Sequence, residues 1–137
     1  MQKRKQYVEI EEDSGTVLRY FHHLNGDGLV EETAAVDPTA YVERSAYVDP
    51  GAKVDAHVRI HSGAWVDRDA LVQAGALIGS AVHVGRGAVI GRGAKLGPRV
   101  KVGAGARVED GAHVAADVII AAGAVVREPR RSGLAAA

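Results

Sequence analysis

The stretch GRGAVIGRGAKLG, residues 85–97, spells nearly the same six residues twice. The unit is shorter than two turns of an α-helix, and it is too regular for a loop. Stepping by six from Val36 to Val126 meets an aliphatic residue every time, through sixteen consecutive hexads. This period is neither that of a helix nor the plain alternation of a strand, so it indicates short strands separated by a tight turn in every hexad.

A small residue stands four positions after each of these aliphatic residues except Val126, usually alanine, with valine at 58, 82, 100 and 118. Glycine precedes the small residue eight times, always before alanine, which predicts turn residues with positive φ and two variants of the corner. Val82, Val100 and Val118 are three hexads apart. We therefore expect a triangular prism with three strands per coil, in which residues 18 apart stack in columns.

The repeat divides the chain into three parts, residues 1–35, 36–127 and 128–137. In the first part, QYVEIEEDSGTVLRYF at 6–21 alternates on both sides of an Asp-Ser-Gly turn, which predicts a β-hairpin that caps the strand edges of the first coil. The following HHLNGDG is expected to be a loop, with His22 and His23 at the surface. The last part is a C-terminal tail, either a short capping helix or a frayed end.

Composition narrows the class of protein. The 17 basic and 17 acidic residues cancel, and aromatic residues make up only 4% of the chain, so the core must be narrow and aliphatic. Cysteine, a charged-then-apolar leader and an apolar run near eighteen residues are all missing from the sequence, which favours a soluble, cytoplasmic protein with no membrane partner. Net neutrality and the lack of a basic aromatic sheet face argue against nucleic acid. Residues 70–108 contain six bases and no acid, so a small anionic ligand is conceivable.

The hexad pattern resembles the hexapeptide-repeat family of left-handed parallel β-helices, which includes acyltransferases, nucleotidyltransferase C-terminal domains and γ-class carbonic anhydrases. The resemblance covers residues 36–127 and implies an all-β fold, a left-handed parallel β-helix of about five coils with the N-terminal hairpin as its cap. The left hand comes from the resemblance alone, because the usual crossover rule favours the opposite hand. Members of the family are typically trimers, which implies a homotrimer here.

Side chains just before each inward aliphatic residue should point outward in three columns. The columns are Tyr47, Trp65, His83, Lys101 and Ile119; Tyr41, Arg59, Leu77, Lys95 and His113; and Lys53, Leu71, Val89, Arg107 and Val125. The resemblance implies acetyl-CoA or another acyl-CoA bound between subunits and a histidine base, with His83 as the first candidate and His113 as the second. Trp65 would stack on the acceptor or on adenine. The candidate contacts to CoA phosphates are Lys95, Arg99, Lys101 and Arg107.

Two hypotheses therefore remain open, an acyl-CoA-dependent O- or N-acyltransferase with sites between the subunits of a trimer, and a non-catalytic trimeric scaffold. The scaffold is favoured by the uninterrupted hexads, since many hexapeptide acyltransferases carry an external loop that helps build the acceptor site. In a scaffold the same columns would be buried between subunits, where aromatic and arginine anchors are common. A γ-class carbonic anhydrase-like zinc site is a minor alternative, because the spacing of His57, His61 and His83 does not match that family, and we expect no metal.

Overall fold

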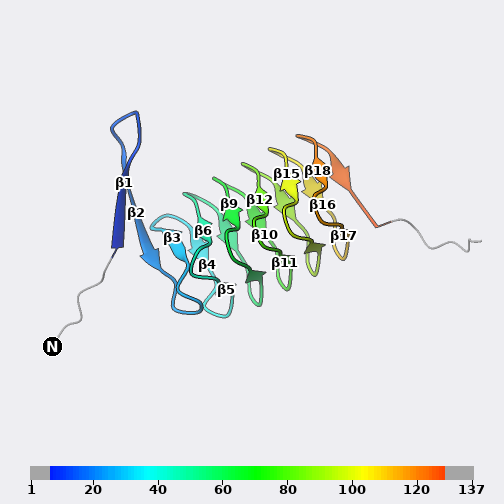
Figure 1. The fold of residues 1–137 in the computed structure, drawn as a ribbon, viewed down its shortest axis with the longest axis horizontal. Coiled ribbons are helices and arrows are strands. Elements are labelled where there is room, and N and C mark those ends of the chain that lie inside the picture. Colours follow the sequence, from blue (N-terminus) through cyan, green and yellow to red (C-terminus); the bar gives the residue numbers. More distant parts are fainter. Residues whose placement is uncertain (1–6, 129–137) are drawn as a thin grey trace, which may run out of the picture.

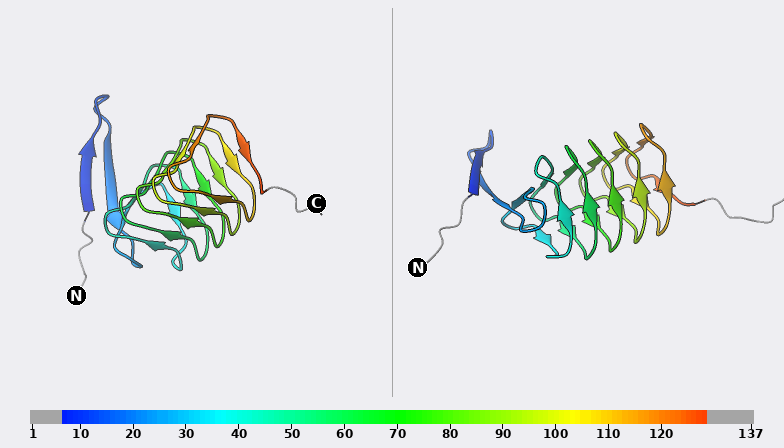
Figure 2. Two further views of the ribbon diagram at one scale, coloured as in Figure 1. Left: turned by 45° about the vertical axis from the view of Figure 1, so that its right-hand side comes forward. Right: turned by 60° about the horizontal axis from the view of Figure 1, so that its bottom comes forward.

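The computed structural model describes residues 7–128, in which every regular element is a β-strand (Figure 1). Short strands wind into coils that stack along one axis, and a β-hairpin stands at the N-terminal end of the stack (Figure 2). The coils form three parallel sheets, and the fold agrees with the left-handed β-helix of about five coils that the resemblance implies. No helix in the described part of the chain is long and apolar enough to cross a membrane.

The three sheets are the faces of the prism. The first sheet contains β1 (Tyr7–Glu11), β2 (Val17–His22), β3 (Leu29–Glu31), β6 (Tyr47–Val48), β9 (Trp65–Val66), β12 (His83–Val84), β15 (Lys101–Val102) and β18 (Ile119–Ile120). The second sheet contains β4 (Ala35–Val36), β7 (Lys53–Val54), β10 (Leu71–Val72), β13 (Val89–Ile90), β16 (Arg107–Val108) and β19 (Val125–Val126). The third sheet contains β5 (Tyr41–Val42), β8 (Arg59–Ile60), β11 (Leu77–Ile78), β14 (Lys95–Leu96) and β17 (His113–Val114).

Strand register confirms the three predicted columns. From β3 onward each strand pairs in parallel with the strand three elements later, and paired residues are 18 apart in sequence, as in Trp65, His83 and Lys101. The second residue of each pair points inward, so Val66, Val84 and their equivalents build a core of small branched side chains. The largest side chains with less than 2% exposure are Ile60, Ile78, Ile90 and Leu96.

From Gly51 to Gly123 the corners share one backbone conformation, although the sequence shows two corner variants. Eight glycines before alanine have positive φ, but so do His57, Ala81, Arg99 and Asp117, which precede the four valines, and Asp69, which precedes alanine. These corners use a left-handed residue whatever its type, and the chain turns there between two strands within one hexad. The two corner variants therefore differ in residue type and not in backbone conformation, and nothing in the structure explains why glycine precedes only alanine.

The first coil turns its corners differently. Thr33, Thr39 and Ser45, termed the hydroxyl caps, occupy the corner position without positive φ. Their hydroxyls accept the backbone N–H groups of the next coil: Gly51 N to Thr33 Oγ1 at 3.1 Å, His57 N to Thr39 Oγ1 at 2.9 Å and Gly63 N to Ser45 Oγ at 2.9 Å. In later coils a backbone carbonyl accepts the equivalent bond, as Ala56 O accepts from Gly75 N. The caps thus satisfy donors at the N-terminal end of the stack.

A carboxylate two residues earlier holds each hydroxyl cap. The acceptors are Glu31 for Thr33, Asp37 for Thr39 and Glu43 for Ser45, and each takes both the hydroxyl and the backbone N–H of its cap. Donation of these hydrogen bonds to the charged form lowers the pKa of Asp37 and the pKa of Glu43.

The predicted hairpin is confirmed, since β1 and β2 pair antiparallel around the expected turn. It continues the first sheet, because β2 pairs antiparallel with β3, and β3 pairs in parallel with β6. The parallel stack therefore begins at β3, one strand before the predicted start of the repeat at residue 36.

The loop after the hairpin folds beneath the first coil and closes the edge of β5, where Gly28 N donates to Val42 O and Val42 N donates to Asn25 O. His22 is exposed as expected, but His23 is not. It is buried at 8% exposure with Nε2 2.9 Å from the carbonyl oxygen of Ala40, because the loop turns inward there. The prediction that His23 is a surface residue is wrong.

The C-terminal end of the stack leaves apolar side chains in solvent. Val118, Ile119 and Val125 are exposed, with Ile119 at 74%. Of the predicted tail at 128–137, residues 129–137 lie outside the described residues.

Candidate functional site

Three rings stack on the outer face of the first sheet. The parallel register places Tyr47, Trp65 and His83 one above another on successive coils. The centroids of Tyr47 and Trp65 are 5.7 Å apart at 20° between ring planes, and those of Trp65 and His83 are 4.0 Å apart at 14°. A ring of this chain therefore stacks on each face of the indole, and the stacking of Trp65 on a ligand stays a prediction.

A buried carboxylate fixes the indole from the side. Asp49 follows β6 and is only 8% exposed. Its Oδ2 accepts from Trp65 Nε1 at 2.6 Å, and its Oδ1 accepts from the hydroxyl of Tyr20 at 2.6 Å. Burial, followed by the hydrogen bond to Asp49, raises the pKa of Tyr20 above its usual range, so the phenol remains a proton donor.

His83 has a carboxylate partner. Its Nε2 lies 3.0 Å from Oδ2 of Asp67, and the side chains are 33% and 18% exposed, respectively. Because an ionised carboxylate only accepts hydrogen bonds, Nε2 is the donor in this contact, and the neutral form of the imidazole would carry its lone pair on Nδ1. The other oxygen of Asp67 accepts the backbone N–H of Arg68 at 2.7 Å, which holds the carboxylate toward the ring. The pair has the parts of a general base and the group that orients it.

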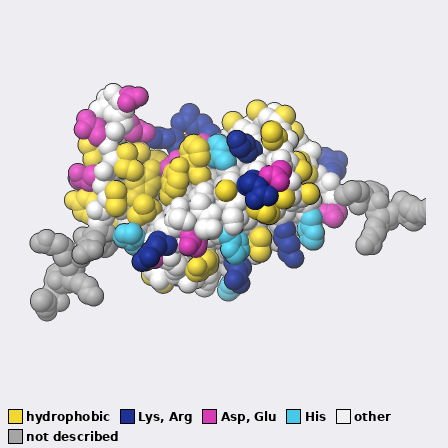
Figure 3. All heavy atoms as spheres, viewed as in Figure 1, with side chains coloured by type: hydrophobic (Ala, Val, Ile, Leu, Met, Phe, Trp, Pro, Cys, Tyr) yellow, Lys and Arg dark blue, Asp and Glu magenta, His cyan; other side chains and the backbone are white. Residues whose placement is uncertain are grey.

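Charged side chains border the pair on both sides. The guanidinium of Arg68 forms an ion pair with Glu12, which precedes the hairpin turn. Lys101 stands opposite His83 in the register of β12 and β15. Figure 3 shows apolar side chains gathered between the hairpin and the first coils, with histidine and basic side chains further along the prism. The site is thus an open face rather than an enclosed cavity.

The other predicted site residues lie elsewhere on the prism. His113 is on the third sheet, and its exposed ring makes no hydrogen bond to any residue in the range 7–128, although its backbone N–H donates to Glu128 at 3.0 Å. Lys95 is also on the third sheet, Arg107 is on the second, and Arg99 stands at a corner with its guanidinium paired to Asp117 at 2.7 and 3.1 Å. Within one chain the structure brings only Lys101, Trp65 and His83 together.

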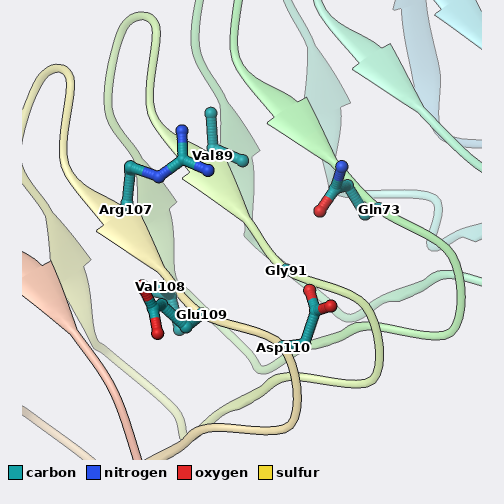
Figure 4. A pocket seen from close by; sticks show the side chains of 7 residues that line it. All are labelled: Gln73, Val89, Gly91, Arg107, Val108, Glu109 and Asp110. Carbon is teal, nitrogen blue, oxygen red and sulfur yellow. The ribbon is translucent and has the colours of Figure 1, made fainter.

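A shallow hollow of about 280 Å³ lies on a different face (Figure 4). It is lined by Gln73, Val89, Gly91, Arg107, Val108, Glu109 and Asp110. The hollow contains Arg107 but no histidine, so it holds no counterpart of the His83–Asp67 pair. Across residues 7–128 no three histidine or carboxylate side chains gather in a way that could hold a metal ion.

Sequence reasoning missed the two carboxylates of this site. Their signal was present, since Tyr47 and Trp65 are each followed two residues later by an acid, Asp49 and Asp67. Residues two apart in a strand share a face, and each acid then meets the ring of the next coil, sixteen residues further along. An aromatic-x-acid pattern repeated every 18 residues would have predicted the partner of His83.

Comparison with known proteins agrees with the fold. A family model described as bacterial transferase hexapeptide (six repeats) matches residues 93–128. No curated protein matches the sequence.

Solved structures provide further matches. A variant of perosamine N-acetyltransferase from Caulobacter crescentus, bound to CoA and GDP-perosamine, is 33% identical over 70% of this chain and 49% of its own, with a TM-score of 0.36. The acetyltransferase domain of PglB from Neisseria gonorrhoeae, bound to acetyl coenzyme A, is 25% identical over 70% of this chain and 55% of its own, with a TM-score of 0.33. The chain thus spans about half the length of these structures. The same hexads and parallel coils run through the chain from residue 36, outside the matched residues 93–128 as well, so the chain is similar to hexapeptide-repeat proteins over its whole repeat.

Proposed function

We propose that the protein is an acyl-CoA-dependent acyltransferase that acts on a hydroxyl or amine, with His83 as the general base. The observation that carries the proposal is the His83–Asp67 pair on the exposed face of the first sheet. The match to a family model of bacterial transferases supports the reaction class. Acyl-CoA as the donor rests on the resemblance to hexapeptide acyltransferases, and so does the CoA-binding role of the basic residues.

Nδ1 of His83 would take the proton from the acceptor as the acceptor's oxygen or nitrogen attacks the thioester carbonyl. When the tetrahedral adduct collapses, the C–S bond breaks and the imidazolium returns that proton to the leaving sulfur, so that free CoA is released. Asp67 holds the ring through Nε2 and stabilises the imidazolium that forms, while Trp65 fixes the plane of the ring. Such a base contributes about 10²- to 10⁴-fold to the rate. Bound acyl-CoA would supply the thioester. Lys101 is the basic side chain nearest along the same column, and it fits a phosphate or carbonyl oxygen next to the ring.

The proposal includes a homotrimer. In one chain Lys95 lies on the third sheet and Arg107 on the second, on other faces of the prism than His83, so a neighbouring subunit would bring such residues to the same CoA molecule. A three-fold assembly brings different faces of two prisms together and meets this requirement.

The first test is calorimetric titration of acetyl-CoA, with free CoA as companion ligand, into protein whose mass is known from light scattering. One site per subunit of a trimer, weakened by Lys101→Ala, supports the proposal. No heat at ligand concentrations near a millimolar would overturn it.

The second test is CoA release with a panel of amine and hydroxyl acceptors. His83→Asn should lower kcat by about 10²-fold or more while acetyl-CoA binding is retained. His113→Asn is the matched comparison, since its ring lacks a carboxylate partner among residues 7–128. Loss of turnover in His113→Asn with full activity in His83→Asn would assign the base to the other face.

A non-catalytic trimeric scaffold is the second candidate. The observation that favours it is the regular spacing of strands from β4 to β19, which leaves no room for an external acceptor loop in this part of the chain. A scaffold would be a stable trimer that is indifferent to CoA.

A further inference from the structure

The N-terminal hairpin makes two side-chain connections to the face that carries His83. We propose that it is part of the site, and that Tyr20, Asp49 and Glu12 are positioning residues that fix the imidazole of His83. The catalytic meaning of this inference rests on the function proposed above, but the positioning itself can be tested without any turnover.

The first connection runs from Tyr20 on β2 through Asp49 to the indole of Trp65. Both oxygens of Asp49 are used, one by each partner, and the carboxylate is buried, so it has little freedom to move. The indole N–H lies in the plane of its ring, and a bond in that plane sets the direction in which the ring faces. Trp65 therefore presents a fixed flat surface to His83, 4.0 Å away.

The second connection runs from Glu12 to Arg68, the residue after Asp67. An unpaired guanidinium beside Asp67 would compete with His83 for the carboxylate, because arginine binds carboxylates with two parallel hydrogen bonds. Glu12 occupies the guanidinium and leaves Oδ2 of Asp67 to the imidazole. The charged groups around the ring are then Asp67 on one side, Lys101 in the next coil and the neutralised Arg68.

A hairpin that served only as an edge cap would not need these side chains. The pairing of β2 with β3 is made by the backbone, through Tyr20 with Glu31, Phe21 with Val30 and His22 with Leu29. The phenolic hydroxyl of Tyr20 and the carboxylate of Glu12 can thus be removed while the backbone pairing stays. This separates positioning from capping.

The test uses the full chain and two NMR signals. Trp65 is the only tryptophan, so its indole N–H gives a single ¹H–¹⁵N peak. The ring protons of His83 experience the ring current of the stacked indole, and its ¹⁵N shifts report which nitrogen carries the proton. The variants are Tyr20→Phe, Glu12→Gln and the double variant. The matched controls are Tyr41→Phe on the third sheet and Glu11→Gln on β1.

Tyr20→Phe should lower the hydrogen-exchange protection of the indole N–H by about tenfold or more and move the His83 ring protons toward their unstacked shifts. Glu12→Gln should leave the indole peak in place but shift the imidazole from the Nε2–H form toward a mixture of tautomers. Both controls should match the wild type. Wild-type indole and imidazole signals in the double variant would overturn the proposal and leave the hairpin as a cap. If Tyr20→Phe fails to fold, Glu12→Gln decides alone, since an unchanged tautomer there contradicts the second connection.

Kinetics distinguish this inference from the proposed function. Where wild-type acyl transfer is observed, the double variant should lower kcat with little change in KM for acetyl-CoA, because the CoA contacts are untouched. Where no transfer is observed, the proposed function fails, and the NMR signals still decide the positioning.

Discussion

Gly85 and Gly87 stand two residues apart and are glycine for different reasons. Gly87 has a φ of +68°, and a Cβ added there would meet no atom within 4 Å. Gly85 lacks positive φ, but its added Cβ would clash with the carbonyl oxygen of Val102 in the next coil. The first position requires a left-handed backbone, and the second requires empty space. Asp69, one coil earlier in the column of Gly87, shows that a side chain is accepted there.

Gly87→Asn should therefore stay within about 1 kcal/mol of the wild type, because asparagine enters the left-handed region readily. Gly85→Ala should cost about 1–3 kcal/mol, since one coil must move away from the next. Gly87→Val should also destabilise, because a branched side chain resists positive φ. Urea denaturation measures all three. A larger loss for Gly87→Asn than for Gly85→Ala would reverse the assignment.

The inward register can be tested with neighbouring strands of the third sheet. Ile78→Asp places an unpaired charge in a fully buried position and should cost several kcal/mol, enough to unfold a marginal domain. Lys95→Asp changes an exposed residue of β14 and should stay within about 0.5 kcal/mol. Thermal unfolding followed by circular dichroism gives the result. Equal melting temperatures for the two variants are incompatible with the packing described.

The first coil is a distinct element because its corners rely on side chains. Its acid-x-hydroxyl pattern repeats every six residues at Glu31 with Thr33, Asp37 with Thr39 and Glu43 with Ser45. In each case a carboxylate orders a hydroxyl, which in turn receives a donor from the second coil. The stability of this coil should therefore depend on ionised carboxylates.

The lowered pKa values of Asp37 and Glu43 set the direction of that dependence. A depressed pKa adds stability above the ordinary values of 3.8 and 4.5 and loses it as pH falls through the lowered values. The double variant Asp37→Asn, Glu43→Gln should melt below the wild type at pH 7, and the gap should narrow as pH falls below 4. Melting curves from pH 7 to pH 2.5 measure the gap. A gap that is constant or widens on acidification would contradict the role of the charges.

Elements differ in how far the sequence predicts them. The columns follow from arithmetic, since a six-residue period with three strands per coil determines which residues stack, and Trp65, His83 and Lys101 lie as expected. The contact between Asp67 and His83 depends on the conformations of the two side chains across neighbouring coils, which the six-residue period does not specify. The hairpin extends the first sheet because β2 pairs with β3. The loop between these strands folds inward at His23, although its polar composition predicts an exposed loop. Local pattern predicted the prism, and tertiary contact decided the site.

Over the whole molecule, each coil touches only the coils above and below it, so stability should be approximately a sum over coils and their contacts. Removing a whole coil of three hexads leaves every remaining residue on its own face. Removing a number of residues that is not a multiple of six breaks the inward period of the aliphatic residues.

Deletion of residues 85–102 should consequently give a folded, shorter protein with a β-rich circular dichroism spectrum and a lower melting temperature. The deletion joins Val84 to Gly103, which occupies the place of Gly85 one coil later. Deletion of residues 85–101 is the matched control and should abolish cooperative unfolding, because the inward period is broken. Cooperative melting of both deletions would show that the hexad does not govern the core.

The hydroxyl caps also restrict where duplicated coils can be inserted into this protein. From Asp69 onward, corner N–H groups donate to backbone carbonyls of the coil before, so each of these coils can be copied in tandem with its bonds complete. The first coil is not copied in this way, because the backbone N–H groups of Thr33, Thr39 and Ser45 donate to carboxylates of their own coil and would give no bond to a coil placed before them. Tandem duplication can therefore extend this protein only on the carboxyl side of its first coil, and relatives of different length should share their beginning and differ in the number of coils that follow.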